Sequence, residues 1–549
     1  MTMDFTLRRI AILGGLFCGA IALGETEVEV WLTTESLDVT LEQQEDVLFK
    51  DDGSGGGLIV DIDEDTQYQT IDGWGVSLTG ASSWLITERL SDAKRQEVME
   101  SLFGPTGIGL SMLRQTIGAS DFNLSTYSYN DGEEDPQLER FSIERDREYI
   151  LPRIRDALSI NPQIKVMGSP WSPPGWMKSS GDLIGGTLLN THYETNADYL
   201  VKFIQAYEEE GVPIYAITPQ NEPGYSPAHY PGMILTKNQQ IRFIGDYLGP
   251  ALRTAGLDRV KIICHDHNYD GLDIPQAILS SSASEYVAGS GFHHYGGPIQ
   301  AMSTLNSEFP EKGIWFTEGG FGEWNDHFDN IVHEMIEIPR NWAKAIVLWN
   351  AALDQNSGPS VIGEDNPNEG MLLIRSDSMD QVSYNGQYYY LGHLSKFVRP
   401  GAVRIASPSW IGDLETVAFK NLDSSVALVV ANRSQSARRI TVNWRGKHFE
   451  YEVPRRCMIT YQWGGNYDYT SVVSGLEIDP AGSDFSVRFD LDTKQRGPMF
   501  NVQKSGTLNE RDWNYMLPRR VATEVGVETW MVETGGAVDQ LFIKINVWP

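Results

Sequence analysis

Glu222 and Glu318 are the residues whose type and spacing best fit chemistry. Each ends a short apolar run and is followed at once by Pro or Gly, a pattern typical of a buried strand leading into a loop. Their spacing is about three βα units of roughly 30 residues each. Most of the 74 acidic residues are expected to be solvated surface charge. Because Glu222 and Glu318 share the same placement at a strand end, they are better explained as the pair of carboxyl groups that cleaves a glycosidic bond.

Eight apolar runs alternate with helical patterns and would position these two glutamates. This alternation predicts an α/β fold, a (β/α)₈ TIM barrel, whose chemistry lies at the C-terminal ends of the strands. A doubly wound sheet is the main alternative, but no G-x-G-x-x-G or Walker pattern follows a strand. The expected strands are Thr70–Leu78, Ile108–Leu113, Ile164–Gly168, Ile214–Thr218, Val260–Cys264, Ser290–His293, Ile314–Thr317 and Ala345–Trp349. The expected helices include Glu148–Ile160, Tyr193–Glu210, Lys237–Ala255 and Phe328–Trp342.

The segments around the barrel predict further domains. Residues 1–24 have the form of a secretory signal peptide, with Arg8 and Arg9 before an apolar run and the small residues Ala20 and Ala22. Residues 25–57 read as strands and a Gly-rich linker, and residues 58–400 as the barrel. A period of two in residues 401–464 predicts an antiparallel β-sandwich side domain, which the early strands could complete. Residues 465–549 form a β-rich extension without an interpretable motif.

Composition limits the partners and the compartment. A net charge of −31 and a pI near 4.7 argue against nucleic acid or anionic membrane surfaces. No later segment approaches the roughly 18 apolar residues of a membrane span, so we expect a secreted, soluble and monomeric protein. Cys264 and Cys457 are expected to be small buried hydrophobes rather than a disulfide. Asn123 and Asn432 begin glycosylation sequons.

Other polar and aromatic residues stand near the ends of the expected strands. Indole faces stack on sugar rings, and Arg, Asn and His donate to hydroxyls and carboxylates, so these residues are candidate substrate contacts. Any one of them could be ordinary packing, but their coincidence at most strand ends favours a sugar site. The candidates are Arg114, Trp171, Asn221, His267, His294, Tyr295 and Trp349.

Five motifs in order along the chain resemble glycoside hydrolase family 30. They are Gln69–Gly75, Ser169–Lys178, Asn221–Pro223, Thr317–Gly319 and Leu391–Pro400. The resemblance covers roughly residues 60 to 465 and implies a barrel with an attached β-sandwich and a retaining mechanism. By this match Glu222 is the acid/base and Glu318 the nucleophile, an assignment the residues alone leave open. Arg114, Trp171 and Asn221 match positions that line the innermost sugar subsite.

The sequence also allows a prediction of which substrate is cleaved. Family members that act on glucosylceramide carry an Asp near the end of the first strand, where this chain has Gly80. That difference and the long loop Ser169–Leu189 favour endo-acting cleavage of β-1,6-glucan. Glucosylceramidase and β-glucosidase activities are the alternatives, and xylanase activity is less favoured because no basic site for an acidic side group is evident.

Two readings from other classes remain open. His265 and His267 on one strand, with His293 and His294 on the next, could ligate a metal in a metal-dependent barrel hydrolase. The chain could also be a non-catalytic glycan-binding protein, although such a protein has no use for an intact glutamate pair. We expect neither a metal nor a cofactor, and a polysaccharide or glycoconjugate as the substrate.

Overall fold

The computed structural model describes residues 26–51, 55–322, 327–362 and 368–464, together with strands β26 to β32 beyond residue 464. The predicted signal peptide, residues 1–24, lies outside the described residues. The chain divides into two compact units. The larger unit, residues 27–420 and 427–462, holds every residue of the candidate site.

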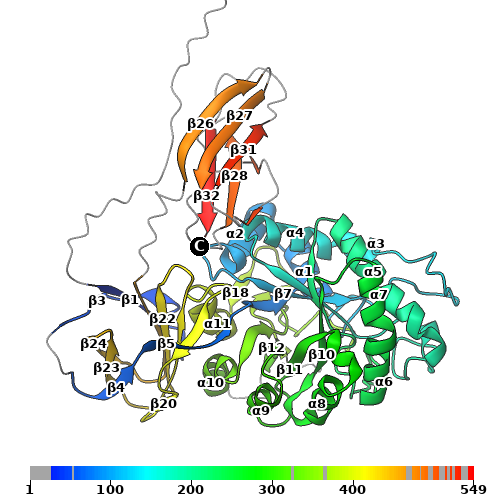
Figure 1. The fold of residues 1–549 in the computed structure, drawn as a ribbon, viewed down its shortest axis with the longest axis horizontal. Helices are drawn as coiled ribbons and strands as arrows, with labels where there is room; N and C mark the ends of the chain where they lie inside the picture. The colour runs from blue at the N-terminus through cyan, green and yellow to red at the C-terminus, as the bar shows by residue number, and fades with distance from the viewer. Residues whose placement is uncertain are drawn as a thin grey trace, which may run out of the picture. The chain divides into compact units, whose positions relative to one another are not determined.

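The larger unit contains a closed barrel of eight parallel strands, as predicted (Figure 1). Each of the eight expected apolar runs supplies one strand, because a strand buried on both faces needs a nearly continuous apolar sequence. The strands are β6 (Gly73–Ser77), β7 (Met112–Ile117), β8 (Lys165–Pro170), β9 (Ile214–Ile217), β10 (Lys261–Asn268), β11 (Val287–His293), β12 (Gly313–Glu318) and β14 (Ala343–Leu348).

Side chains fill the barrel interior. Met112, Met167, Ile263 and Trp315 are at most 3% exposed and pack together there with smaller residues of the neighbouring strands. A filled barrel is a rigid core rather than a pore. The strand ends are therefore held at fixed positions, which a catalytic site requires.

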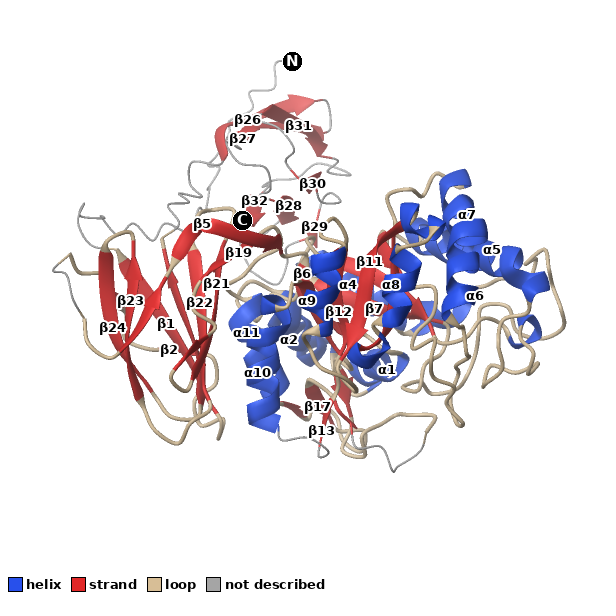
Figure 2. Cartoon of the chain, turned by 60° about the horizontal axis from the view of Figure 1, so that its bottom comes forward, coloured by secondary structure: helices blue, strands red, loops and turns tan. Residues whose placement is uncertain are grey.

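Helices lie around the outside of the barrel strands (Figure 2). The four helical patterns of the sequence each yield a helix, although Lys237–Ala255 is divided by a π-helical turn at Phe243–Leu248. The helices are α1 (Gly80–Glu88), α2 (Asp92–Phe103), α3 (Glu144–Glu148), α4 (Ile150–Ile160), α5 (Tyr193–Glu209), α6 (Lys237–Arg242), α7 (Gly249–Thr254), α8 (Asp273–Leu279), α9 (Ala301–Glu308), α10 (His327–Arg340) and α11 (Gly386–Ser395).

A β-sandwich flanks the barrel. One sheet has the order β2-β1-β25-β22-β21-β19-β5 and the other the order β24-β23-β4. The strands are β1 (Glu27–Thr34), β2 (Glu42–Gln43), β3 (Val47–Leu48), β4 (Leu58–Asp61), β5 (Asp63–Thr70), β19 (Val403–Ala406), β20 (Trp410–Ile411), β21 (Leu414–Lys420), β22 (Val426–Asn432), β23 (Arg438–Trp444), β24 (Lys447–Val453) and β25 (Cys457–Trp463).

The placement of residues 58–70 in the barrel is wrong. Strand β4 pairs with β23 and strand β5 pairs with β19, so both belong to the sandwich. The alternation of exposed and buried residues in β4 fits a sheet with one solvated face. The barrel therefore begins close to residue 71 instead of residue 58.

His393 joins the last barrel helix to the sandwich. Its imidazole lies 2.8 Å from Thr460 Oγ1 and 2.9 Å from Thr33 Oγ1, and the side chain is fully buried. Burial lowers the pKa of His393 to about 3, so the ring is neutral at ordinary pH. The two domains thus share a buried polar contact.

Short sheets follow two barrel strands at the catalytic rim. Strand β13 (Phe321–Gly322) pairs with β16 (Asn368–Glu369), and β15 (Ala352–Leu353) joins β17 (Leu372–Ile374) and β18 (Val382–Tyr384). In the other unit, β26 (Val473–Ala481), β27 (Asp484–Leu491) and β31 (Gly526–Val532) form one sheet. The second sheet there contains β28 (Met499–Ser505), β29 (Asn514–Tyr515), β30 (Arg520–Val521) and β32 (Phe542–Trp548).

Three further expectations concern single residues and spans. Cys264 and Cys457 are buried, and neither forms a disulfide in the described part of the chain. Asn432 is fully buried and its amide donates to the carbonyls of Ser436 and Pro454, so a folded chain has no room for a glycan there. Among the described helices, none combines the length and apolarity needed to cross a membrane.

Candidate active site

Glu222 and Glu318 meet at the C-terminal rim of the barrel. Glu318 is the last residue of β12, and Glu222 lies in the loop that follows β9. One oxygen of each carboxyl group and one nitrogen of His293 all lie within 4.8 Å of one another. Retaining glycosidases hold their carboxyl groups about 5 to 5.5 Å apart, whereas inverting enzymes need about 6.5 Å or more. The pair therefore has the spacing of a double displacement.

Arg114 holds Glu318 in place. Its Nη1 donates to Glu318 Oε2 at 2.6 Å, and its Nη2 donates to Asn221 Oδ1 at 2.6 Å. The guanidinium is fully buried. The expected strand ended at Leu113, but β7 runs to Ile117, so Arg114 lies inside the strand and extends into the barrel mouth. This short contact between buried groups fixes the position of the Glu318 carboxyl.

Asp266, a polar residue near the end of β10, is a buried hub that was not among the candidate substrate contacts. Burial alone would raise its pKa, but the charge of Arg114 and several hydrogen bonds hold the pKa well below its usual range. The signal in the sequence was its place within a polar strand end, yet its role depends on neighbours from four other strands. Its side chain is within 2.6–3.0 Å of Arg114, Ser169, Thr218, His293 and Thr317.

His293 places a positive charge beside Glu222. Its Nδ1 lies 3.2 Å from Glu222 Oε1, and its Nε2 lies 3.0 Å from Asp266 Oδ1. Burial disfavours this charge, but the carboxylates of Glu318, Asp266 and Glu222 outweigh burial and raise the pKa of His293 to about 9. Burial would raise the pKa of Glu222, but His293 lowers it by hydrogen bonding and charge. At neutral pH the free enzyme therefore holds a charged His293 beside an ionised Glu222, and Glu222 gains its proton as the pH falls.

His267 approaches the same carboxyl without a charge. Its Nε2 lies 3.8 Å from Glu222 Oε1, consistent with its expected place in the site. Burial lowers the pKa of His267, so its ring is neutral where His293 is charged. The two histidines therefore act differently on Glu222.

The backbone around these groups is strained. Glu222, Asp266 and Asn350 have φ values of 45°, 51° and 71°, in the left-handed region that non-glycine residues rarely adopt. The N–H of Glu222 donates to the carbonyl of Asp266 at 3.0 Å, which helps to fix the loop. Strain of this kind is typical of functional sites, where surrounding contacts enforce an unfavourable backbone.

Trp171 and Trp349 support Arg114. Their rings stack on each other with centroids 5.0 Å apart, and each residue is only 3% exposed. The guanidinium of Arg114 lies 4.9 Å from the Trp171 ring. Little of either side chain is exposed, and the expected contact of these residues with a sugar stays a prediction.

Tyr295 and His294 have separate roles. The Tyr295 hydroxyl donates to Glu318 Oε1 at 3.0 Å, so it completes the surroundings of that carboxylate. His294 instead lies 2.8 Å from both Glu334 oxygens and 3.0 Å from the carbonyl of Gly320. Both of its ring nitrogens are engaged, so His294 fixes the loop after Glu318 and is not placed to contact a sugar.

Asp121 is a further carboxyl that the motif analysis missed. It is 9% exposed, and burial with the charges of Glu318 and Glu222 raises its pKa well above the usual value. Its Oδ1 has no hydrogen-bond partner among the described residues. The chain therefore carries a carboxyl at the site besides Glu222, Glu318 and Asp266, four residues after the end of β7. Position 80 carries a glycine in place of the Asp, but Asp121 supplies a carboxyl near Glu318 and Glu222, so the glycine does not argue against binding of a glucoside.

The histidine cluster does not fit a metal centre. Glu222, His293 and Glu318 are close enough to share an ion. However, a metal ligand must be a neutral imidazole, so an ion here would have to displace the proton that a pKa of about 9 places on His293. His265 Nε2 already lies 3.0 Å from the carbonyl of Asn268. The donor set is therefore arranged for proton and charge chemistry.

A carboxyl pair at this spacing on the rim of a (β/α)₈ barrel defines a retaining glycoside hydrolase. Sequence comparison agrees. The glycosyl hydrolase family 30 TIM-barrel domain matches residues 71–398, and the β-sandwich domain of that family matches residues 401–461. The chain belongs to glycoside hydrolase family 30.

Three relatives show the range of the family. An endo-1,6-β-D-glucanase of Aspergillus fumigatus is 31% identical over 434 residues, covering 74% of this chain and 87% of that protein. The lysosomal acid glucosylceramidase of Mus musculus is 30% identical over 446 residues, covering 75% of this chain and 84% of that protein. A solved endo-β1,6-glucanase superposes with a TM-score of 0.74 at 33% identity, covering 80% of this chain and 99% of that chain.

Proposed function

We propose that this enzyme cleaves internal bonds of β-1,6-glucan, with Glu318 as the nucleophile and Glu222 as the acid/base. The observation that carries the mechanism is the separation of the two carboxyl groups, within 4.8 Å between oxygens. The substrate rests on the similarity to endo-1,6-glucanases at 31% and 33% identity.

In the first step Glu318 attacks the anomeric carbon. Arg114 and Tyr295 each donate a hydrogen bond to one of its oxygens, so the carboxyl group is oriented before substrate binds. The C–O bond to the departing glucan segment breaks, and the protonated form of Glu222, whose share grows as the pH falls, gives that oxygen its proton. A glycosyl group is then esterified to Glu318.

In the second step Glu222 acts as a base. It takes a proton from a water molecule that enters after the departing segment, and the resulting oxygen attacks the anomeric carbon from the face that the segment left. Glu318 is released as a carboxylate, and the configuration is retained. His293, 3.2 Å from Glu222, stabilises the ionised form of Glu222 that this step requires.

Glucosylceramide is the second candidate substrate. The mouse glucosylceramidase is 30% identical to this chain, and Asp121 supplies a carboxyl beside the catalytic pair. Xylanase activity has less support, because a solved xylanase of Talaromyces cellulolyticus is only 22% identical to this chain and shares the fold alone.

Product analysis separates the candidates. Purified enzyme is incubated with linear β-1,6-glucan, glucosylceramide and xylan, with Glu318→Gln as the control. Short β-1,6-linked oligosaccharides from wild type alone are the expected result. Cleavage of glucosylceramide but not of the glucan would overturn the proposed substrate and leave the mechanism in place.

We also propose that the enzyme is a secreted monomer acting on a polysaccharide. The support is the signal-peptide pattern of residues 1–24 and the acidic composition with a net charge of −31. Recovery of the mature chain from culture medium, with a new N-terminus close to residue 25, would test secretion. Its mass in solution by light scattering would test the monomer.

A further inference from the structure

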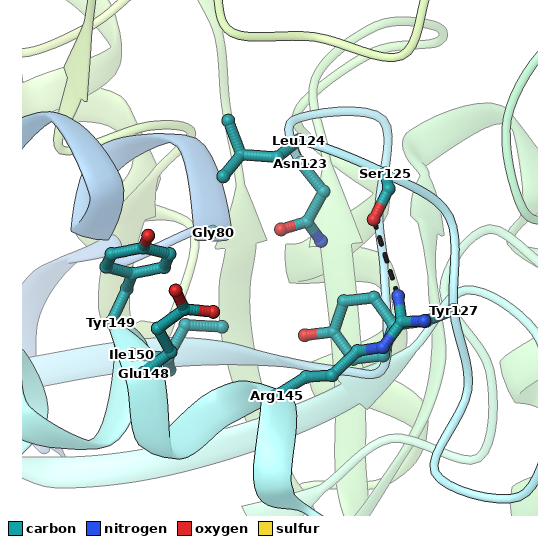
Figure 3. Close-up of a pocket in the computed structure, with 9 residues that line it drawn as sticks. All are labelled: Gly80, Asn123, Leu124, Ser125, Tyr127, Arg145, Glu148, Tyr149 and Ile150. Atoms are coloured by element: carbon teal, nitrogen blue, oxygen red, sulfur yellow. Dashed lines mark hydrogen bonds between the residues drawn. The ribbon is translucent and has the colours of Figure 1, made fainter.

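A cavity of about 330 Å³ opens beside the loop that carries Asp121. Figure 3 shows its walls, which come from the start of α1, the loop after β7 and helices α3 and α4. This volume is at the lower end of the roughly 300–1,000 Å³ typical of ligand pockets. The lining residues are Gly80, Asn123, Leu124, Ser125, Tyr127, Arg145, Glu148, Tyr149 and Ile150.

Asn123 points into this cavity with an unused amide. The residue is 4% exposed, and its Nδ2 has no hydrogen-bond partner among the described residues. Figure 3 shows the amide between Tyr149 on one side and Tyr127 on the other. A buried donor without an acceptor costs free energy, so the arrangement favours a ligand that supplies an acceptor.

Gly80 makes room for this amide. A Cβ at position 80 would lie 1.5 Å from Asn123 Oδ1 and 2.6 Å from its Cγ. Gly80, which stands where glucosylceramide-cleaving members carry an Asp, therefore leaves space for the Asn123 side chain. Any larger residue at this position would displace Asn123 from the cavity.

The remaining walls select for a neutral, hydroxyl-rich ligand. Arg145 and Glu148 bring one charge of each sign to the exposed mouth, so the cavity has no net preference for an ion. Arg145 is already drawn to one wall, where its Cζ lies 5.0 Å from the Tyr127 ring and its Nη1 donates to Ser125 Oγ at 3.4 Å. Leu124 and Ile150 add apolar surface suited to the C–H face of a pyranose.

We propose that this cavity binds a glucosyl unit of the substrate chain outside the catalytic centre. Asn123 donates to a sugar oxygen, Glu148 accepts from a hydroxyl, and Tyr149 covers one ring face. Asn123 follows Asp121 by two residues, so their Cα atoms are at most about 7 Å apart. One loop thus carries a residue of the catalytic centre and a residue of the cavity, and the proposal is that a single glucan chain occupies both. The inference rests on the proposed β-1,6-glucanase activity.

The test compares long and short substrates in Asn123→Ala and Tyr149→Ala, produced in a host without N-glycosylation so that the Asn123 amide is free. The readout is the ratio of kcat/KM on long β-1,6-glucan to kcat/KM on a β-1,6-linked disaccharide. One ordinary hydrogen bond corresponds to roughly a two- to tenfold change, and we expect the ratio to fall by that factor, through KM. Glu144→Gln is the control, since Glu144 lies on α3 with the lining residues Arg145 and Glu148 but pairs with Arg147 and is absent from the lining.

Direct binding completes the test. In the Glu318→Gln background, affinity for β-1,6-linked oligosaccharides should rise with length, and Tyr149→Ala should flatten that rise. Tyr149 stands half-buried at the mouth, so its removal tests the cavity even if Asn123→Ala fails to fold. If both variants cleave the glucan normally and the ratio of kcat/KM on long glucan to kcat/KM on the disaccharide is unchanged, the cavity does not bind sugar. The proposed function would still stand in that case. Failure of the wild type to cleave β-1,6-glucan would instead overturn the proposed function, and the cavity's assignment to that glucan with it.

Discussion

Replacing His293 by Gln should move the alkaline limb of the pH–activity profile to higher pH. The imidazolium lies 3.2 Å from Glu222 Oε1 and lowers the pKa of that acid. Gln retains a hydrogen-bond donor and much of the volume but no charge. Without the charge, Glu222 keeps its proton to higher pH, so the protonated form that the first step needs persists.

The size of this shift follows from the geometry. Two unit charges about 4 Å apart interact by about 4 kcal/mol at an effective dielectric constant of about 20, which equals about three pKa units. Water that enters the space left by the smaller Gln side chain, together with the remaining charge of Arg114, reduces this change in the pKa of Glu222. We therefore expect the alkaline limb of kcat/KM to move by about one to two pH units.

His267→Gln is the matched control. His267 lies 3.8 Å from the same carboxyl oxygen, but its lowered pKa leaves the ring neutral. Profiles of kcat/KM on one substrate, from about pH 4 to about pH 9, would compare both variants with wild type. Equal shifts in the two variants, or a shift to lower pH in His293→Gln, would refute the assigned charges.

Three further predictions concern the acid, the nucleophile's support and stability. Glu222→Ala should lose least activity on substrates with a good leaving group, since these need little protonation; equal losses on activated and natural substrates would contradict its role as the acid. Arg114→Lys should lower kcat/KM by about 100-fold, because one ammonium group cannot reproduce the fork that orients Glu318; near-normal kinetics would contradict that role. His393→Gln should weaken the pH dependence of stability. The folded pKa of His393, about 3, lies below its unfolded value near 6.5, so its contribution is complete above about pH 6.5 and falls by up to about 1.4 kcal/mol per unit below it. Urea unfolding of both proteins at several pH values would measure this, and parallel curves would count against it.

The barrel strands and the two glutamates could be predicted from the sequence because each depends on a short, continuous stretch of residues. A strand buried on both faces needs an apolar run, and a catalytic residue at the rim follows that run directly. Glu318 shows this most plainly, as the final residue of β12. Strand β4 was harder to place, because a short run such as Leu58–Asp61 suits either domain and only its pairing with β23 decides.

The roles of single side chains were less predictable because they depend on neighbours from distant strands. Asp266 becomes a hub only when β7, β8, β11 and β12 surround it. Trp171 and Trp349 stack on each other, a contact between two distant strand ends that neither motif could show. His294 was expected at the site, and its contact with Glu334 on α10 draws it into the support of the loop.

The most direct test of the account is to trap the glycosyl-enzyme. A slowly turned-over 2-fluoro glucosyl donor with a good leaving group is added to the wild type, and the digested protein is read by mass spectrometry. The account predicts a single added glycosyl group on the peptide that contains Glu318, and release of a product with retained configuration. A label on Glu222, or turnover with inverted configuration and no label, would contradict it.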